Sequence, residues 1–167
     1  EARADGNLYL IDGVRDQIGL TERADILFAW HAKYRPQAVG YETYGMQSDI
    51  AHIEDRMERE QYRFHITELG GSLRKEDRIR RLKPRLERGG FWFPETMPRT
   101  LLSGNNVDLM DLILTEEVAH FPVARLDDFL DMLSRIEDLE EMKLLKFPKF
   151  APVDVTDEVT YSHWQSV

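Results

Sequence analysis

Four acidic residues have the chemistry and the expected placement for binding divalent metal ions: Glu42, Asp127, Asp128 and Asp131. Mg²⁺ and Mn²⁺ prefer oxygen ligands, and two such ions roughly 4 Å apart require several carboxylates that converge on one point. Glu42 lies in the short apolar run 37–45, a pattern typical of a buried strand that would deliver it to a sheet edge. The three aspartates fall on one face at the start of a predicted helix.

Each of these acids also has a simpler explanation. An Asp pair in a first helical turn is commonly an N-cap followed by an acid that the helix dipole stabilises. Asp131 could be an exposed helix acid, and Glu42 a solvated residue at the end of a strand. Because the chain has no cysteine, disulfides and Cys-ligated zinc are excluded. The five histidines show no His-x-x-x-His pairing, so we expect them to be structural.

A basic segment, residues 74–88, is the second candidate for function. It contains eight basic and three acidic residues, although the formal net charge of the chain is −9. Lys and Arg neutralise backbone phosphates and so provide DNA affinity that does not depend on sequence. The best candidates for DNA contacts are Arg74, Lys75, Arg78 and Arg81. The alternative is that these side chains form an ordinary solvated helix face.

The hydrophobic pattern predicts strands that alternate with helices. We expect strands at 8–14, 37–45, 62–69 and 91–94. We expect helices at 22–34, 46–60, 74–88, 107–119 and 125–133. Such alternation indicates an α/β fold in which helices cover both faces of a sheet.

Individual residues refine this scheme. Thr21 is a plausible N-cap for the first helix, and Pro84 should interrupt the basic helix. In that helix we expect Ile79, Leu82 and Leu86 to face inward, with the arginines on a different face. Pro94 should end a short edge strand. Asp5-Gly6 is typical of a hairpin turn, which predicts a partner strand upstream of the chain's first residue.

The length of 167 residues fits one domain, expected at 1–140, followed by a tail at 141–167. No apolar run approaches the roughly 20 residues that a membrane span requires. The sequence contains no Gly-x-x-x-x-Gly-Lys-Ser/Thr phosphate loop, so these residues are not expected to hydrolyse ATP.

A series of short sequence segments occurs in one order: 39–50, 67–79, 90–94, 116–122 and 126–131. The series resembles the carboxy-terminal nuclease domain of phage terminase large subunits, and the resemblance spans roughly residues 8–136. It implies an RNase H-like fold, a mixed sheet flanked by helices. The family also has an acid on the first strand of its sheet, and we expect that strand to precede this chain.

The resemblance implies a two-metal-ion endodeoxyribonuclease that uses Mg²⁺ or Mn²⁺ to cut concatemeric double-stranded DNA during viral genome packaging. Glu42, Asp127 and Asp128 match its catalytic metal ligands, and Asp131 matches a position that is often acidic. The implied partners are double-stranded DNA, the terminase ATPase domain, the portal and the small terminase subunit, in the cytoplasm of an infected host cell. The alternatives are another RNase H-like nuclease, such as a junction resolvase, and a catalytically silent DNA-binding or motor-docking module.

Overall fold

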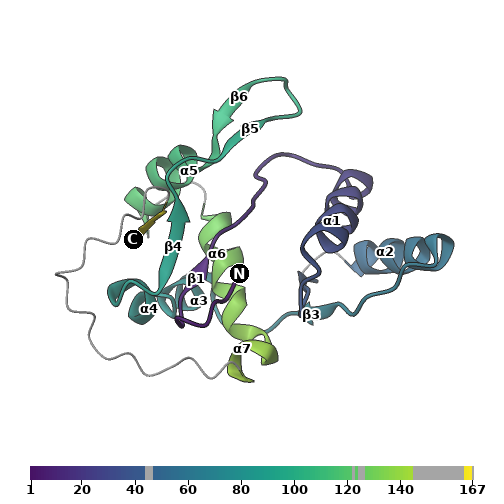
Figure 1. Cartoon of the computed structure of the whole chain (residues 1–167), viewed down its shortest axis with the longest axis horizontal. Coiled ribbons are helices and arrows are strands. Elements are labelled where there is room, and N and C mark those ends of the chain that lie inside the picture. Colours follow the sequence, from purple (N-terminus) through teal and green to yellow (C-terminus); the bar gives the residue numbers. More distant parts are fainter. Residues whose placement is uncertain (44–46, 122, 124–126, 145–163, 167) are drawn as a thin grey trace. The chain divides into compact units, whose positions relative to one another are not determined.

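The computed structural model describes residues 1–43, 47–121, 123, 127–144 and 164–166. The chain divides into two compact units (Figure 1). Unit 1 comprises residues 1–16, 74–134 and 145–167, and unit 2 comprises residues 17–73 and 135–144. Helices and small sheets with parallel strand pairs make the protein a mixed α/β protein, as predicted. The described strands form three separate small sheets.

The sheet of unit 1 has the strand order β1-β4-β7. Strands β1 (Leu8–Tyr9) and β4 (Phe91–Pro94) are parallel, and β7 (Trp164–Ser166) runs antiparallel to β4. The prediction that 91–94 is an edge strand is therefore wrong, since β4 pairs on both sides. Its end at Pro94 is confirmed. The predicted division at residue 140 stays a prediction.

The chain begins with the expected hairpin turn. The Arg3 amide donates to Asn7 O at 3.1 Å, and Gly6 adopts a φ of 81°, which glycine tolerates without strain. Residues 1–3 lie antiparallel to the start of β1 through a bridge between Ala2 and Leu8. Strand β1 ends at Tyr9, five residues before the predicted end.

Two short helices, α3 (Lys75–Arg80) and α4 (Lys83–Glu87), replace the single basic helix. The interruption predicted at Pro84 is confirmed, because this proline lies in the first turn of α4, where its missing N–H costs nothing. Helix α3 packs against α6 (Asp128–Ser134). Buried residues of this part of the core are Ile79, Leu82, Phe129, Leu130 and Leu133.

The region before α6 starts as a hairpin of β5 (Pro98–Thr100) and β6 (Asn106–Asp108). Helix α5 (Leu109–Leu112) follows, then a π-helical turn (Ile113–Glu117) and a 3-10 turn (Val118–His120). The predicted helix at 107–119 thus begins two residues later than expected. Asp108 caps it by accepting a hydrogen bond from the Met110 amide at 2.9 Å.

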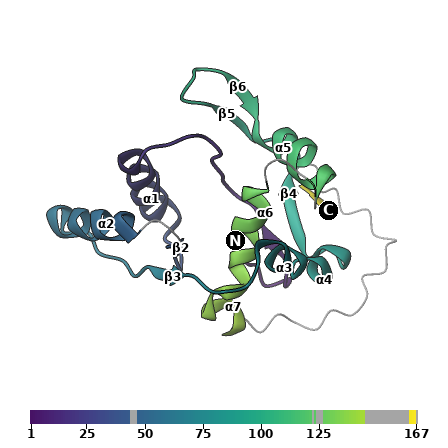
Figure 2. The ribbon, with the colours of Figure 1, turned by 180° about the vertical axis from the view of Figure 1, so that it is seen from behind.

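Unit 2 contains α1 (Leu20–Tyr34), α2 (Gln47–Glu60) and α7 (Glu140–Leu144), with the parallel strands β2 (Gly40–Glu42) and β3 (Thr67–Leu69) (Figure 2). Both long helices were predicted, α1 from its expected N-cap and α2 from its apolar spacing. The predicted N-cap is wrong, because α1 begins at Leu20 with Gly19 at the N-cap position and Thr21 inside the helix.

The core of unit 2 is formed by Ala24, Phe28, Ile53 and Met57. Alternate residues of segment 62–66 pack against it: Tyr62, Phe64 and Ile66. The predicted alternation is therefore present in the side chains, but only residues 67–69 of the predicted strand 62–69 form a ladder. Among the described residues, no helix is both long enough and apolar enough to cross a membrane.

Candidate functional site

Asp127 and Asp128 lie at the start of α6, next to Lys75 of α3. Lys75 Nζ is 2.6 Å from Asp127 Oδ1 and 2.8 Å from Asp128 Oδ1. The side chains remain accessible, with exposed fractions of 25% for Asp127 and 75% for Asp128. One ammonium group thus joins both carboxylates at a surface that solvent can reach.

The charge of Lys75 is reinforced by this pairing. Burial lowers the pKa of the Lys75 ammonium, but hydrogen bonds to Asp127 and Asp128 outweigh that effect, and the pKa is raised overall. Lys75 is therefore positively charged at neutral pH and balances part of the charge of the Asp pair. It was predicted to contact DNA, and here its ammonium contacts carboxylates.

Glu117, rather than Asp127, caps the first turn of α6. Its Oε2 accepts hydrogen bonds from the amides of Phe129 at 2.9 Å and Leu130 at 3.3 Å. The carbonyl of Asp127 accepts from the amide of Asp131 at 2.9 Å, which puts Asp127 at the N-cap position in the backbone. The N-cap explanation for the Asp127 side chain is therefore wrong.

The role of Glu117 was not predicted from the sequence, although a signal was present. Glu117 follows Leu109 and Ile113 at steps of four residues, and both of those residues are buried. An acid on the apolar side of a predicted helix must find partners when the helix packs. That rule would have marked Glu117 as a structural or functional acid.

Asp131 and Arg78 form a buried bidentate ion pair. Arg78 Nε donates to Asp131 Oδ1 at 2.9 Å, and Arg78 Nη2 donates to Oδ2 at 2.7 Å. The prediction that Arg78 points away from the buried face is wrong, because pairing with Asp131 compensates for its burial. Both oxygens of Asp131 are engaged, which argues against Asp131 as a metal ligand and against Arg78 as a phosphate contact.

The two other basic candidates remain on the surface. Arg74 precedes α3, Arg81 follows it, and both residues are exposed. Arg81 is the residue at which α3 ends before the Pro84 break. Their role in DNA binding stays a prediction.

Glu42 is the last residue of β2, at the strand terminus where the sequence predicted it. The prediction that this strand is buried is wrong. Gly40 is exposed, and Tyr41 and Glu42 are half-buried. The Glu42 carboxylate pairs with Arg135, at the start of the 3-10 turn Arg135–Asp138. Arg135 also donates to the carbonyl of Gly70 at 3.2 Å, and sequence analysis did not anticipate it as the partner of Glu42.

Tyr41 and Arg23 both bind the buried carboxylate of Asp49 in unit 2. The Tyr41 hydroxyl donates to Asp49 Oδ2 at 2.8 Å, and Arg23 Nη2 donates to the same oxygen at 2.7 Å. Burial, followed by the hydrogen bond to Asp49, raises the pKa of Tyr41 to about 12. These groups tie α1 and β2 to the first turn of α2, and we interpret them as structural.

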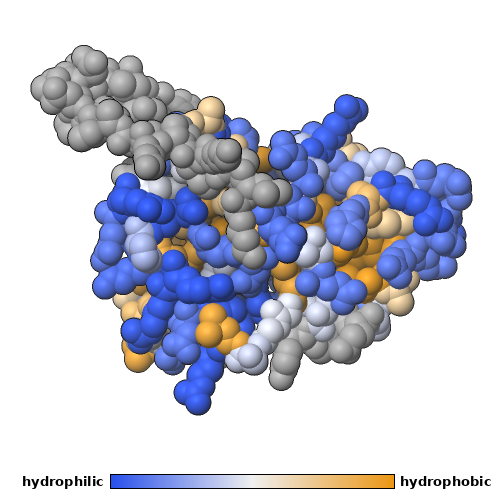
Figure 3. All heavy atoms as spheres, turned by 90° about the horizontal axis from the view of Figure 1, so that it is seen from below, coloured by the Kyte–Doolittle hydropathy of each residue, from blue (hydrophilic) through white to orange (hydrophobic). Residues whose placement is uncertain are grey.

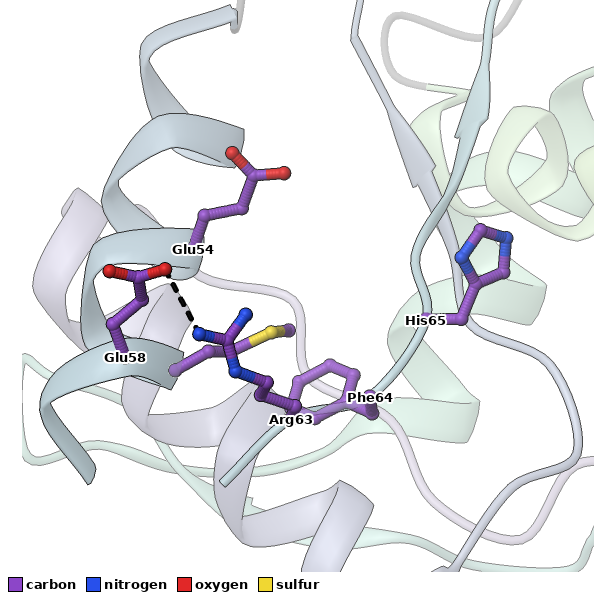
Figure 4. Close-up of a pocket in the computed structure, with 6 residues that line it drawn as sticks. Glu54, Glu58, Arg63, Phe64 and His65 are labelled. Carbon is purple, nitrogen blue, oxygen red and sulfur yellow. Dashed lines mark hydrogen bonds and ion pairs between the residues drawn. The ribbon is translucent and has the colours of Figure 1, made fainter. Parts of the chain in front are cut away.

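An open hollow of about 660 Å³ lies beside α2 (Figure 4). Its lining residues are Glu54, Met57, Glu58, Arg63, Phe64 and His65. Arg63 reaches across to Glu58, with Nη2 3.0 Å from Oε1. Figure 3 shows hydrophobic residues among hydrophilic ones at the right, the side on which Figure 1 labels α1 and α2. Arg63, the arginine among the described lining residues, is thus paired with an acid of the same hollow.

Within each unit, the described residues contain no group of three or more Asp, Glu or His side chains placed to share a metal ion. Glu42 belongs to unit 2, whereas Asp127 and Asp128 belong to unit 1. Their convergence therefore stays a prediction. The Asp pair by itself offers two carboxylates to one cation, a donor set that suits Mg²⁺, which is commonly held by one or two carboxylates and several waters.

Comparison with known proteins found no relative: no protein-family model, no curated protein and no solved structure matches this chain. The resemblance to terminase nuclease domains thus depends on the ordered sequence segments alone. It stays a prediction.

Proposed function

We propose that this chain is the nuclease domain of a viral DNA-packaging terminase, with an RNase H-like fold, and that it cuts double-stranded DNA with divalent metal ions. The observation that carries the proposal is the pair of accessible carboxylates, Asp127 and Asp128, directed at a single cation. Two further features support it: the ordered sequence segments, and the position of Glu42 at the carboxyl end of a parallel strand.

The donor chemistry fits the proposed metal. Both aspartates approach one ammonium nitrogen to within 3 Å, so one small cation can contact both carboxylates. Asp127, Asp128 and Glu42 would hold Mg²⁺ or Mn²⁺. When bound, the ions would supply an activated water and stabilise the leaving 3′ oxygen. Lys75 competes for the same oxygens and balances the Asp pair in the metal-free protein.

The DNA contacts follow from the basic segment. Arg74 and Arg81 carry exposed positive charge on either side of α3, where they can contact phosphates without reading bases. The other partners and the setting come from the resemblance alone: the terminase ATPase domain, the portal and the small terminase subunit, in an infected host cell.

A second candidate function is a catalytically silent DNA-binding or motor-docking module. It is favoured by Lys75, because an internal ammonium can balance the Asp pair permanently without a metal. Another RNase H-like nuclease, such as a junction resolvase, would share the proposed chemistry but would prefer branched DNA.

Nicking of supercoiled plasmid by the full-length protein that contains this chain, in Mn²⁺ or Mg²⁺, tests the proposal. We expect metal-dependent nicking that falls to background in an Asp127→Asn/Asp128→Asn variant and in Glu42→Gln, because each substitution removes negatively charged oxygen ligands. Glu76→Gln is the matched control, since Glu76 is an exposed acid of the neighbouring helix α3.

Two results would contradict the proposal. Equal nicking by the parent and the double variant would remove the Asp pair from the active site. DNA binding without any metal-dependent nicking in the parent would favour the silent module.

A further inference from the structure

Glu117 is a buried acid with an unusual set of partners. Its exposed fraction is 0%, and it is the last residue of the π-helical turn. Arg15 Nε lies 3.1 Å from Glu117 Oε1, and Arg15 Nη1 also donates to Glu116 at 3.0 Å. Burying a carboxylate is costly unless it is paired and hydrogen-bonded. Among the described residues, the two amides at the start of α6 donate to Oε2, whereas Arg15 balances the charge at Oε1 without donating a hydrogen bond to it.

The cap that Glu117 provides takes over the usual role of an N-cap aspartate. An aspartate at that position normally accepts hydrogen bonds from the second and third amides of its helix. In α6 these are the amides of Phe129 and Leu130, and both are bound by Glu117. The Asp127 carboxylate points instead to Lys75. The same side chain could not serve the cap and a bound cation equally well.

We propose that Glu117, whose charge is balanced by Arg15, is a positioning residue. It accepts the hydrogen bonds of the capping amides of α6 and thereby keeps the Asp127 carboxylate directed at the cation that it shares with Asp128, either the Lys75 ammonium or a bound metal ion. The cation-binding part of this inference rests on the proposed function. A π-helical turn is a rare local geometry that often occurs at functional sites. Here it ends at the residue that makes the cap.

A purely structural role of Glu117 and a positioning role predict different results when Glu117 is removed. If Glu117 only stabilises α6, its removal lowers stability and leaves the direction of Asp127 unchanged. If it positions Asp127, its removal exposes two amides that the Asp127 carboxylate can then bind. The first test therefore measures which carboxylate the amides of Phe129 and Leu130 bind.

Amide chemical shifts measured by NMR provide that test without any metal. Asp127→Ala should leave the Phe129 and Leu130 amide shifts nearly unchanged in the parent protein. In a Glu117→Ala background the same change should move both amide protons strongly upfield, because Asp127 has become the cap. Equal responses in the two backgrounds would overturn the proposal. If Glu117→Ala does not fold, Glu117→Asp provides the same comparison with a shorter acid beside Arg15.

Mn²⁺ affinity measured by calorimetry provides the second test. Glu117→Ala should weaken binding about 10-fold or more, a usual cost of losing an outer-shell partner. Glu117→Gln should stay near the parent, because its amide oxygen can still accept from the two amides. In an Asp127→Ala background, Glu117→Ala should cause no further loss. Unchanged affinity in a folded Glu117→Ala protein, or equal losses in both backgrounds, would overturn the proposal.

These two tests separate the inference from the proposed function. A parent protein that binds no Mn²⁺ would contradict the nuclease proposal, while the amide shifts would still decide what Glu117 does. A parent that binds Mn²⁺ with shifts that do not depend on Glu117 would leave the nuclease proposal standing and remove the positioning role.

Discussion

Two ion pairs join α3 to α6, one helical turn apart, and they differ in almost every physical respect. Arg78 and Asp131 are buried, with side-chain exposures of 11% and 10%, and they share two hydrogen bonds. Lys75 and Asp128 are exposed by 36% and 75%, and the Lys75 ammonium is divided between two acids. The comparison shows that an ion pair between a basic and an acidic side chain can stabilise a core when it is buried, or leave the acid accessible to another cation when it is exposed.

The choice of cation explains the difference. The planar guanidinium of arginine presents parallel N–H groups that match a carboxylate, and it is less strongly hydrated than an ammonium. Lysine is a compact, strongly hydrated charge on a flexible stem, so it leaves a partly exposed carboxylate at low cost. The inner pair is therefore suited to anchoring the two helices, and the outer pair to giving way to another cation.

Removing the inner arginine should have the largest effect on stability. Arg78→Ala leaves Asp131 buried without its partner, and breaking a buried pair in this way costs about 3–5 kcal/mol in the free energy of unfolding. Urea denaturation measures the change. Arg81→Ala, at the exposed end of α3, is the control and should stay within about 0.5 kcal/mol. Equal losses in the two variants would mean that the buried pair is not the anchor.

The outer lysine should have a smaller effect that depends on pH. The pKa of Lys75 is raised in the folded protein, so its stabilisation is fully present below the unfolded value of about 10.4 and is lost as pH rises through the folded pKa. Because the pair is partly exposed, we expect at most about 1 kcal/mol. Thermal melts of the parent and Lys75→Met between about pH 8 and pH 12 should converge at the alkaline end.

The same pH series distinguishes the two pairs. Arginine stays protonated throughout this range, so the difference between the parent and Arg78→Ala should persist where that of Lys75→Met disappears. A Lys75→Met difference that is flat with pH would contradict the description of Lys75 as a titrating partner of the Asp pair.

The smallest effect on stability is expected at the exposed arginines. Arg74→Ala/Arg81→Ala should weaken binding to unrelated DNA duplexes about equally and reduce the log-log salt slope by about 0.9 per lost phosphate contact. The melting temperature should change little, because both residues are exposed. Arg59→Ala/Arg63→Ala, which removes the same charge from exposed positions of unit 2, is the control. An unchanged salt slope would indicate a solvated helix face.

Much of the local structure was predictable because it depends on neighbouring residues. The helix predicted at 46–60 is present as α2, and its buried residues Ile53 and Met57 are four residues apart, on one helix face. Pro84 predicted the break after α3 for a purely steric reason. The helix predicted at 125–133 is present as α6, and its apolar residues Phe129, Leu130 and Leu133 are buried.

Most of the wrong predictions concern features that depend on contacts with segments far away in the sequence. Segment 62–66 has the alternation of a strand, but its side chains pack on unit 2 without a ladder. Phe91–Pro94 looked like an edge because of its proline, but pairing with β1 and β7 makes it central. Thr21 is not the N-cap, because α1 begins at Leu20, two residues before the position at which a helix capped by Thr21 would begin.

The sequence by itself determined which residues could act: an acid at a strand end, an Asp pair at a helix start and a basic segment. Only the tertiary structure decided their partners, since Lys75 and Arg78 meet acids more than 50 residues away and Glu117 caps a helix that begins 11 residues later. Spacing along a helix or strand follows from local geometry, whereas a buried charge takes whichever compensating group the packed chain brings to it.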